Sequence, residues 1–407
     1  MELLPITYFA YMFVSFYFLI FTLLLYFKNK NSLFDSPKMT KEYGISVLIP
    51  AYNESKTLAN TIQAIYNVDY NNIKEVIIIN DGSKDDTLKI AKELKSKYLN
   101  LKILDKPNSG KADSLNKALK YCTGELVVVV DADSYPSKDS FKKMVGYFDD
   151  LKVGAVTATC VPRNRNSFLE KLQVIEYKVI AFTRKLLEYV DAIYVVPGTA
   201  GMYRKIAIEK AGFDTKNITE DIEATWHLVH DGWKIRMCLG TYIGTEVPDK
   251  IKPWYAQRRR WALGGLQCIN KYKEMIFRKG MLGYFIVPFF ALGLFLGVIG
   301  IFIFLSLFIR RFLSSYLLTK YSIVLQSPVL VMEDMYITPS VLNYFGVVLF
   351  LLFFIFTFFV LAIMKDRLFE KQSFFNLLFY MTLYLLVYPM VLIVACWHFI
   401  RGKMIWR

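Results

Sequence analysis

Short apolar runs alternate with helical patterns between residues 40 and 275. Runs of β-branched and aliphatic residues predict strands, and apolar positions recurring every three or four residues predict helices. The predicted strands are 45–49, 76–79, 101–104, 126–130 and 153–161, and the predicted helices are 54–65, 87–97, 109–121, 169–187 and a helix opened by 219–221. Because the strands before residue 131 are almost wholly apolar and are separated by helices, they predict a parallel sheet covered on both faces.

A second pattern consists of long apolar runs outside this region. No charged residue occurs in 3–27, 280–309, 341–364 or 372–400. Each run reaches the roughly 20 residues that cross a bilayer as a helix. The sequence therefore predicts a multi-pass cell-membrane protein with about four spans. Residues 312–332 are either a fifth span or an interfacial element, because Lys320, Gln326 and Pro328 interrupt them.

These patterns predict three parts. Residues 1–28 form an N-terminal transmembrane helix, 40–275 form an α/β domain, and 276–407 form a C-terminal region with about three spans and interfacial helices. We interpret the first run as a retained anchor rather than a cleaved signal, because Glu2 precedes it and no small-x-small site follows.

Charge places the α/β domain in the cytosol. Four lysines follow the first run, at positions 28, 30, 38 and 41, and positive residues favour the cytosolic side. The formal net charge of +15 is explained by the same preference, so no nucleic-acid partner is expected. The basic C-terminal end leaves the number of membrane crossings undecided. The five cysteines form no Cys-x-x-Cys pair, which argues against a zinc site or a disulfide framework.

Polar residues follow three of the predicted strands. Ala51, Tyr52 and Glu54 come after the first strand, Asp81 after the second, and Asp131-Ala132-Asp133 after the fourth. The carboxyl ends of parallel strands meet at one edge of a sheet, where ligands bind. We expect these residues to lie in one crevice.

The two aspartates after the fourth strand suit a metal. Carboxylates one residue apart repel each other unless a cation lies nearby, and oxygen ligands of this kind suit Mg²⁺ or Mn²⁺ shared with a diphosphate. The alternative is a pair of solvated loop acids. For Asp81-Gly82-Ser83 the alternatives are a tight turn and an aspartate that binds a base or ribose.

Two glycine-containing segments resemble ligand loops. Asn108-Ser109-Gly110-Lys111 is not a P-loop, because Asp105 and Ala112 occupy the positions that need Gly and Ser or Thr. Lys111 is still expected to reach a phosphate or ribose. The glycines of 197–201 permit a sharp turn or a close approach to a ligand.

Two further polar motifs follow in the sequence. Thr219-Glu220-Asp221 is either a helix cap or an acid pair in which Asp221 takes a proton from an attacking hydroxyl. Gln257-Arg258-Arg259-Arg260-Trp261 is either a membrane-surface anchor or a substrate-binding element. Within it, Arg258 and Arg259 are interpreted as ordinary surface charge.

In this order and spacing, followed by apolar spans, the motifs resemble those of the membrane-integrated processive family 2 glycosyltransferases, the synthases of cellulose, chitin, hyaluronan and poly-N-acetylglucosamine. The sequence is most similar to the poly-β-1,6-N-acetylglucosamine synthases. Thr219-Glu220-Asp221, the short chain with one N-terminal span, and the ending 386–389 followed by 401–403 carry this likeness.

The resemblance implies a GT-A fold (α/β, Rossmann-like) inserted between transmembrane helices. It also implies a processive, inverting transfer from a UDP-sugar, with UDP-N-acetylglucosamine as the expected donor, to a growing glycan that crosses the bilayer as an exopolysaccharide of biofilms. A small membrane auxiliary subunit is a further partner that it suggests.

The implied roles divide the site residues into three groups. Asp221 would be the base with Glu220 beside it, and Asp133 would bind Mg²⁺ or Mn²⁺. The implied donor and acceptor contacts are Ala51, Tyr52, Glu54, Asp81, Lys111, Asp131, Gln257, Arg260 and Trp261. Two alternatives stay open: transfer of a single sugar to a polyprenyl phosphate or glycolipid, and a non-catalytic nucleotide-sensing transporter or receptor.

Overall fold

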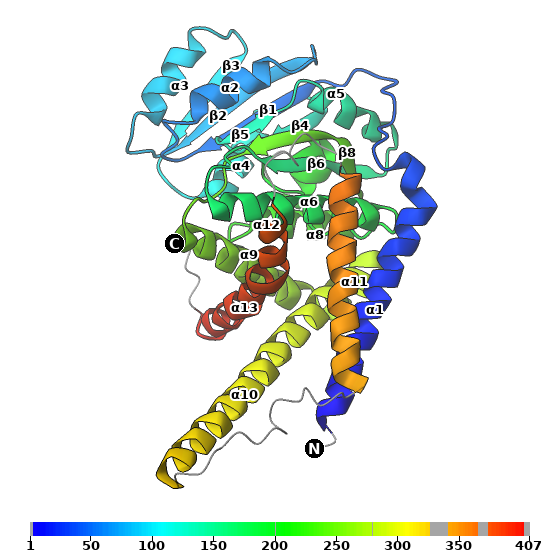
Figure 1. Cartoon of the computed structure of the whole chain (residues 1–407). Coiled ribbons are helices and arrows are strands. Elements are labelled where there is room, and N and C mark those ends of the chain that lie inside the picture. The colour runs from blue at the N-terminus through cyan, green and yellow to red at the C-terminus, as the bar shows by residue number, and fades with distance from the viewer. Residues whose placement is uncertain (1–2, 200, 279, 326–340, 365–372, 403–407) are drawn as a thin grey trace.

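The computed structural model describes residues 3–199, 201–278, 280–325, 341–364 and 373–402. A sheet with helices on both faces forms one end of the molecule, and long apolar helices extend from the other (Figure 1). The eight strands of the sheet lie in the order β3-β2-β1-β4-β7-β6-β8-β5. Their bounds are β1 (Ile45–Ala51), β2 (Ile73–Asp81), β3 (Leu101–Lys106), β4 (Leu126–Val129), β5 (Ser134–Pro136), β6 (Val153–Pro162), β7 (Gly201–Arg204) and β8 (Lys234–Thr245).

The first half of the sheet confirms the predicted parallel arrangement. Strands β3, β2, β1 and β4 are parallel neighbours, and Val47 pairs with Val76 on one side and Val128 on the other. The second half is mixed, because β7 runs antiparallel to β4 and β6. Strands β5, β7 and β8 were not predicted: β5 and β7 are very short, and Lys234, Arg236 and Gly240 interrupt the apolar pattern of β8.

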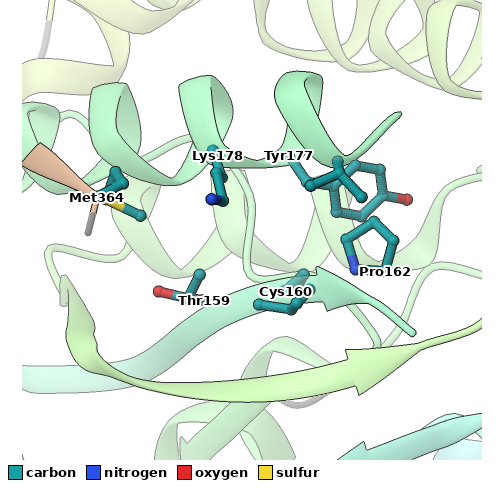
Figure 2. Close-up of a pocket in the computed structure, with 8 residues that line it drawn as sticks. Thr159, Cys160, Pro162, Tyr177, Lys178 and Met364 are labelled. Carbon is teal, nitrogen blue, oxygen red and sulfur yellow. The ribbon is translucent and has the colours of Figure 1, made fainter. Parts of the chain in front are cut away.

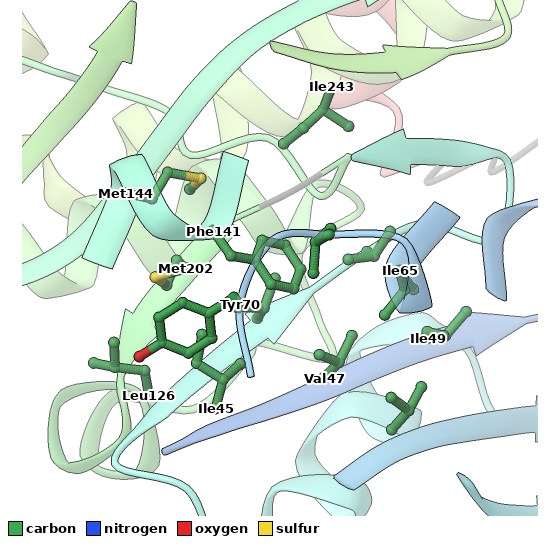
Figure 3. Packing of buried hydrophobic residues seen from close by; sticks show 14 of the residues in the cluster. Ile45, Val47, Ile49, Ile65, Tyr70, Leu126, Phe141, Met144, Met202 and Ile243 are labelled. Carbon is green, nitrogen blue, oxygen red and sulfur yellow. The ribbon is translucent and has the colours of Figure 1, made fainter. Parts of the chain in front are cut away.

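Side chains alternate between the two faces of the sheet. Val47 and Ile49 of β1 join one core cluster, and Leu48 joins the other. The first face is covered by α2 (Leu58–Tyr66), α3 (Thr87–Lys95) and α5 (Ser140–Val145), and Figure 3 shows its packing. The second face is covered by α4 (Lys111–Leu119), α6 (Phe168–Glu188), α7 (Lys205–Ala211) and α8 (Glu220–His230).

Helix α6 lies between the sheet and the apolar helices. Phe182 is fully buried, and its ring centre lies 5.9 Å from that of Tyr26 in α1 (Leu3–Asn29) and 6.3 Å from that of Phe356 in α11 (Val341–Ile363). A capping box between Ser167 and Glu170 fixes the start of α6. The apolar helices are therefore packed directly against the layer that covers the sheet.

Three helical segments of the described chain have the length and composition to cross a membrane, namely 9–32, 282–325 and 374–400, and Val347–Ile363 is a shorter apolar helix. The longest helix, α10 (Val287–Leu325), has 39 residues and measures about 58 Å at about 1.5 Å per residue. The element predicted to begin at Phe312 continues α10 without a break as far as Leu325, and residues 326–332 lie outside the described residues.

The remaining helices are α9 (Ile251–Tyr272), α12 (Phe374–Phe379) and α13 (Leu385–Ile400), with short helical turns η1 (Lys30–Ser32), η2 (Gly146–Asp149), η3 (Lys273–Met275), η4 (Leu282–Ile286) and η7 (Tyr380–Tyr384).

Candidate active site

A lysine joins two of the predicted acidic motifs at the carboxyl edge of the sheet. Lys111 begins α4, and its Nζ lies 2.6 Å from Asp131 Oδ1 and 2.8 Å from Glu220 Oε1. Burial disfavours the charged ammonium, but Asp131, Glu220 and Asp221 together raise the pKa of Lys111 above its ordinary value. The structure thus brings together residues more than 100 positions apart around one fixed positive charge.

The pKa values of the two acids at the start of α8 are shifted in opposite directions. Burial opposes ionisation of Glu220, but the ion pair with Lys111 lowers its pKa below the ordinary value. Burial, followed by the charge of Glu220, raises the pKa of Asp221 to about 6. Within the described residues Asp221 forms no ion pair; its Oδ1 accepts a hydrogen bond from the amide of Ile222 at 2.9 Å. A carboxylate with a pKa near neutral pH and no tight partner is suited to accept a proton.

Asp133 lies in a second acidic group, beyond β4. Burial raises its pKa to about 7, and the neighbouring charges of Asp131 and Glu54 add to the effect. The pKa of Glu54 is itself raised by burial. The one side-chain hydrogen bond to Asp133 comes from Ser134 Oγ, at 3.2 Å, as far as the structure describes the chain.

This acidic group fits a divalent cation that is shared with a substrate. Across the described ranges, no group of three or more His, Cys, Asp or Glu side chains is arranged to hold a metal. Magnesium-type sites need only one or two carboxylates when substrate phosphates supply further oxygens. Asp133 forms no ion pair within the described residues and, with Asp131 beside it, has the oxygen donors for such a site.

Asp81 is used within the protein. It is 4% exposed, pairs with Lys106, and accepts hydrogen bonds from the amides of Ser109 and Gly110, each at 2.9 Å. Both of its carboxylate oxygens therefore hold the loop that precedes Lys111. The turn after Asp81 requires glycine: Gly82 has φ +68°, and an added Cβ would lie 2.7 Å from the amide nitrogen of Asn108.

The end of β1 lies next to this turn. Ala51 is buried and Tyr52 is half-buried. Asn53, which the sequence analysis did not single out, has φ +58° and ties the two strand ends together. Its amide donates to Ser83 Oγ at 3.0 Å, and its Oδ1 accepts from the amide of Lys84 at 2.8 Å. Asparagine is one of the few residues that tolerate this backbone conformation, which is the signal that could have marked it.

The glycine loop before β7 approaches the site through its backbone. The amide of Asp131 donates to the carbonyl of Gly198 at 3.1 Å, and a Cβ on Gly198 would lie 2.4 Å from Lys111 Nζ. The predicted close approach is thus made to Lys111 and Asp131.

A separate small cavity of about 20 Å³ lies between α6 and β6, next to Tyr177 and Cys160 (Figure 2). It holds about one water molecule and is too small for a sugar ring.

Helix α9 carries the Gln-x-x-Arg-Trp motif to this edge. Gln257, Arg260 and Trp261 are half-buried, and the positive charge of Arg260 acts to lower the pKa of both Glu220 and Asp221. The motif therefore lies close enough to interact with the acid pair.

Interpreting Arg258 as surface charge was wrong. This side chain is 2% exposed and forms an ion pair with Glu176 of α6, with Arg258 Nη2 2.5 Å from Glu176 Oε2. Its guanidinium carbon also lies 4.3 Å from the ring centre of Trp261. Glu176 gave no sequence signal, because it is one of seven charged residues in the 21-residue helix α6. Arg259 is half-buried, with its guanidinium carbon 5.9 Å from the ring centre of Tyr255.

Gly264 lets the motif helix contact the acid pair's helix. A Cβ added to Gly264 would lie 1.9 Å from Thr219 Oγ1, whereas one added to Gly265 would meet nothing within 4 Å. Thr219 precedes Glu220 and Asp221 directly. The position of the acid pair therefore depends on the missing side chain at Gly264.

We expect Gly264→Ala to lower turnover by about 100-fold, the effect of displacing a reacting group by about 1 Å. Overpacking should also reduce stability by about 1–3 kcal/mol. Initial rates and thermal unfolding of the purified variant measure both effects. Gly265→Ala is the matched control and should unfold no lower than the wild type, because alanine is the better helix former. Equal activity of the two variants would show that the approach of Gly264 to Thr219 does not set the position of the acid pair.

Comparison with known proteins gives consistent results. Residues 46–210 match the family described as Glycosyl transferase family 2. A poly-beta-1,6-N-acetyl-D-glucosamine synthase of Staphylococcus epidermidis is 30% identical over 360 residues, which cover 86% of this chain and 82% of that protein. A protein of the same name from Staphylococcus aureus strain COL is 32% identical over 264 residues, covering 63% of this chain and 64% of its own length.

The fold also has a solved counterpart. The mannosyltransferase PcManGT from Pyrobaculum calidifontis, in complex with GDP-Man and Mn²⁺, superposes with a TM-score of 0.63 and covers 99% of both chains at 20% identity. At this identity the likeness concerns the fold alone. Together with the family match, it confirms the predicted Rossmann-like GT-A sheet combined with apolar helices.

Proposed function

This chain belongs to glycosyl transferase family 2 and is a glycosyltransferase, and from that premise we propose that it polymerises a UDP-sugar, UDP-N-acetylglucosamine above all. The names of the relatives support the choice of sugar. The observation that carries the proposal is the set of Asp221, Glu220, Lys111 and Asp131 at one edge of the sheet, beside a helix whose Trp261 can stack on a sugar ring. Family membership sets aside the non-catalytic alternative.

The proposed chemistry is a single displacement with inversion. The acceptor hydroxyl oxygen attacks the anomeric carbon from the face opposite the diphosphate, a new C–O bond forms, and the bond to UDP breaks. Asp221 accepts the hydroxyl proton. Lys111 and Arg260 offset the negative charge that develops on the departing diphosphate.

The remaining site residues have binding roles in this proposal. Asp133, with Asp131, would hold Mg²⁺ or Mn²⁺, which neutralises phosphate charge when bound. The uridine would lie at the end of β1, against Ala51, Tyr52 and Glu54. Asp81 would contribute there indirectly, through the loop that it fixes.

We place the catalytic domain, residues 40–275, in the cytosol, where UDP-sugars are found, and the apolar helices in the bilayer as a multi-pass unit. The growing glycan would leave beside α9 and cross the membrane. A small membrane subunit could assist this step. The competing function is transfer of one sugar to a polyprenyl phosphate or glycolipid, which would use the same acids.

Membranes containing the protein, incubated with UDP-[³H]N-acetylglucosamine and Mg²⁺ or Mn²⁺, test the proposal. We expect released UDP and a labelled product of high mass. Membranes containing Asp221→Asn at equal protein level are the control. A labelled product of single-sugar size, extracted with the lipids, would support the competing function. If folded protein released no UDP from this donor or from other UDP-sugars, the proposed donor class would be wrong.

A further inference from the structure

A buried polar network links the motif helix to the C-terminal apolar helix. Its centre is Glu176 on α6, which is 3% exposed. The two oxygens of Glu176 bind the guanidinium of Arg258, with Nη2 to Oε2 at 2.5 Å and Nε to Oε1 at 3.2 Å. A bidentate pair of this kind fixes the orientation of the arginine as well as its position.

Two tyrosines from the C-terminal segment complete the network. Tyr384, at the end of η7, donates its hydroxyl hydrogen to Glu176 Oε2 at 2.6 Å, and Tyr388 of α13 donates to Oε1. Arg258 Nε also donates to the Tyr388 hydroxyl at 2.9 Å, and Trp254 Nε1 donates to the Tyr384 hydroxyl at 2.8 Å. Three separate elements of the chain therefore meet at one carboxylate.

The network reaches the site through Arg258. Its guanidinium carbon lies 4.3 Å from the ring centre of Trp261, within the range of a cation–π contact, and its Nη1 donates to Gln257 Oε1. The arginine thus contacts two of the three motif residues that the resemblance described under Sequence analysis assigns to substrate.

We propose that Glu176 is a positioning residue for the acceptor: through Arg258 it fixes Trp261 and Gln257, and through Tyr384 and Tyr388 it ties their placement to the C-terminal apolar helix. This inference rests on the proposed function. It predicts that damage to the network impairs use of the acceptor more than binding of the donor, because Lys111, Asp131 and Asp133 belong to other elements and Arg260 of α9 acts on the charge of the departing diphosphate.

Glu176→Gln, Tyr388→Phe and the double variant Glu176→Met with Arg258→Met test the proposal. The double variant removes both charges and so avoids leaving one buried and unpaired. Tyr380→Phe is the control: Tyr380 is buried one turn before Tyr384, with ring centres 5.4 Å apart, and its hydroxyl forms no hydrogen bond within the described part of the chain. Michaelis constants are measured for UDP-N-acetylglucosamine and for a short N-acetylglucosamine oligosaccharide as soluble acceptor.

We expect the acceptor KM to rise by about 10- to 100-fold in Glu176→Gln and in the double variant, the loss typical of a hydrogen-bonded charged group. Tyr388→Phe should show a smaller rise, and the donor KM should stay within about twofold in all of them. If the double variant had the wild-type acceptor KM, or if the donor and acceptor KM rose together, the positioning role would be wrong. Failure of the wild type to transfer sugar would instead refute the proposed function.

Discussion

Replacement of Asp221 by asparagine is expected to lower kcat by about 10²- to 10⁴-fold, the usual contribution of a positioned general base. The amide has nearly the same shape and can still accept the hydrogen bond from the Ile222 amide, but it cannot take a proton. Because Asp221 forms no ion pair within the described residues, its loss should leave donor binding intact. UDP binding by calorimetry, beside initial rates of polymer formation, separates the two effects.

The pH dependence of kcat gives an independent check on this role. As the proposed base, Asp221 would act in its carboxylate form, and burial together with the charge of Glu220 raises its pKa to about 6. Turnover should therefore be present above pH 7 and be lost as the pH falls through about 6. In Glu220→Gln burial still raises the pKa of Asp221, but the added effect of the like charge of Glu220 is gone, so this acid limb should move to lower pH.

A carboxylate at the opposite end of the same helix is the control for Asp221→Asn. Asp231 follows α8, and its Oδ2 lies 2.9 Å from Lys210 Nζ, away from the acid pair. Asp231→Asn should keep kcat within about twofold, because this carboxylate lies at the end of α8 opposite to the acid pair. If Asp221→Asn instead abolished UDP binding, Asp221 would be a donor ligand and the base would have to be sought elsewhere.

The grouping of the candidate site residues at one edge of the sheet was largely predictable from the sequence, because these residues follow strong local signals. Asp131 and Asp133 end a run of valines, and Glu220 and Asp221 open a helix, so each motif marks its own position on a strand or helix end. Parallel strands then bring those ends together whatever the details of the helices. The pairing of Lys111 with Asp131 and Glu220 follows from that convergence.

What the sequence did not show depends on partners that are distant in the chain. Arg258, the residue after Gln257, is buried although it is charged, because Glu176 on α6 and Tyr388 on α13 form hydrogen bonds with its guanidinium group. No local pattern distinguishes it from Arg259. The role of Asp81 was hidden in the same way, since the amides that it binds belong to residues 109 and 110.

Asp133→Asn is expected to change activity and stability in opposite directions. Asp133 is crowded by Asp131 and Glu54, and burial with these charges raises its pKa to about 7. A carboxyl group lowers the stability of the folded protein when it is ionised and its pKa is higher in the folded than in the unfolded state. The loss of stability is therefore present above pH 7 and disappears as the pH falls towards 4. In metal-free buffer at pH 8, the asparagine variant should be more stable by about 1 kcal/mol or more.

Turnover should fall by about 100-fold or more in the same variant, because the carboxylate that we propose as the ligand of the catalytic cation is lost. The residual activity should require a higher concentration of Mg²⁺ or Mn²⁺. Thermal unfolding at pH 8 and pH 5 measures the change in stability, and rates measured across a metal titration give the change in activity of the same variant. Asp139→Asn, on a carboxylate that pairs with Lys143 away from the acidic group, is the control. A variant that lost stability and kept its metal dependence would show that Asp133 has a structural role, and the cation would have to be held by other residues.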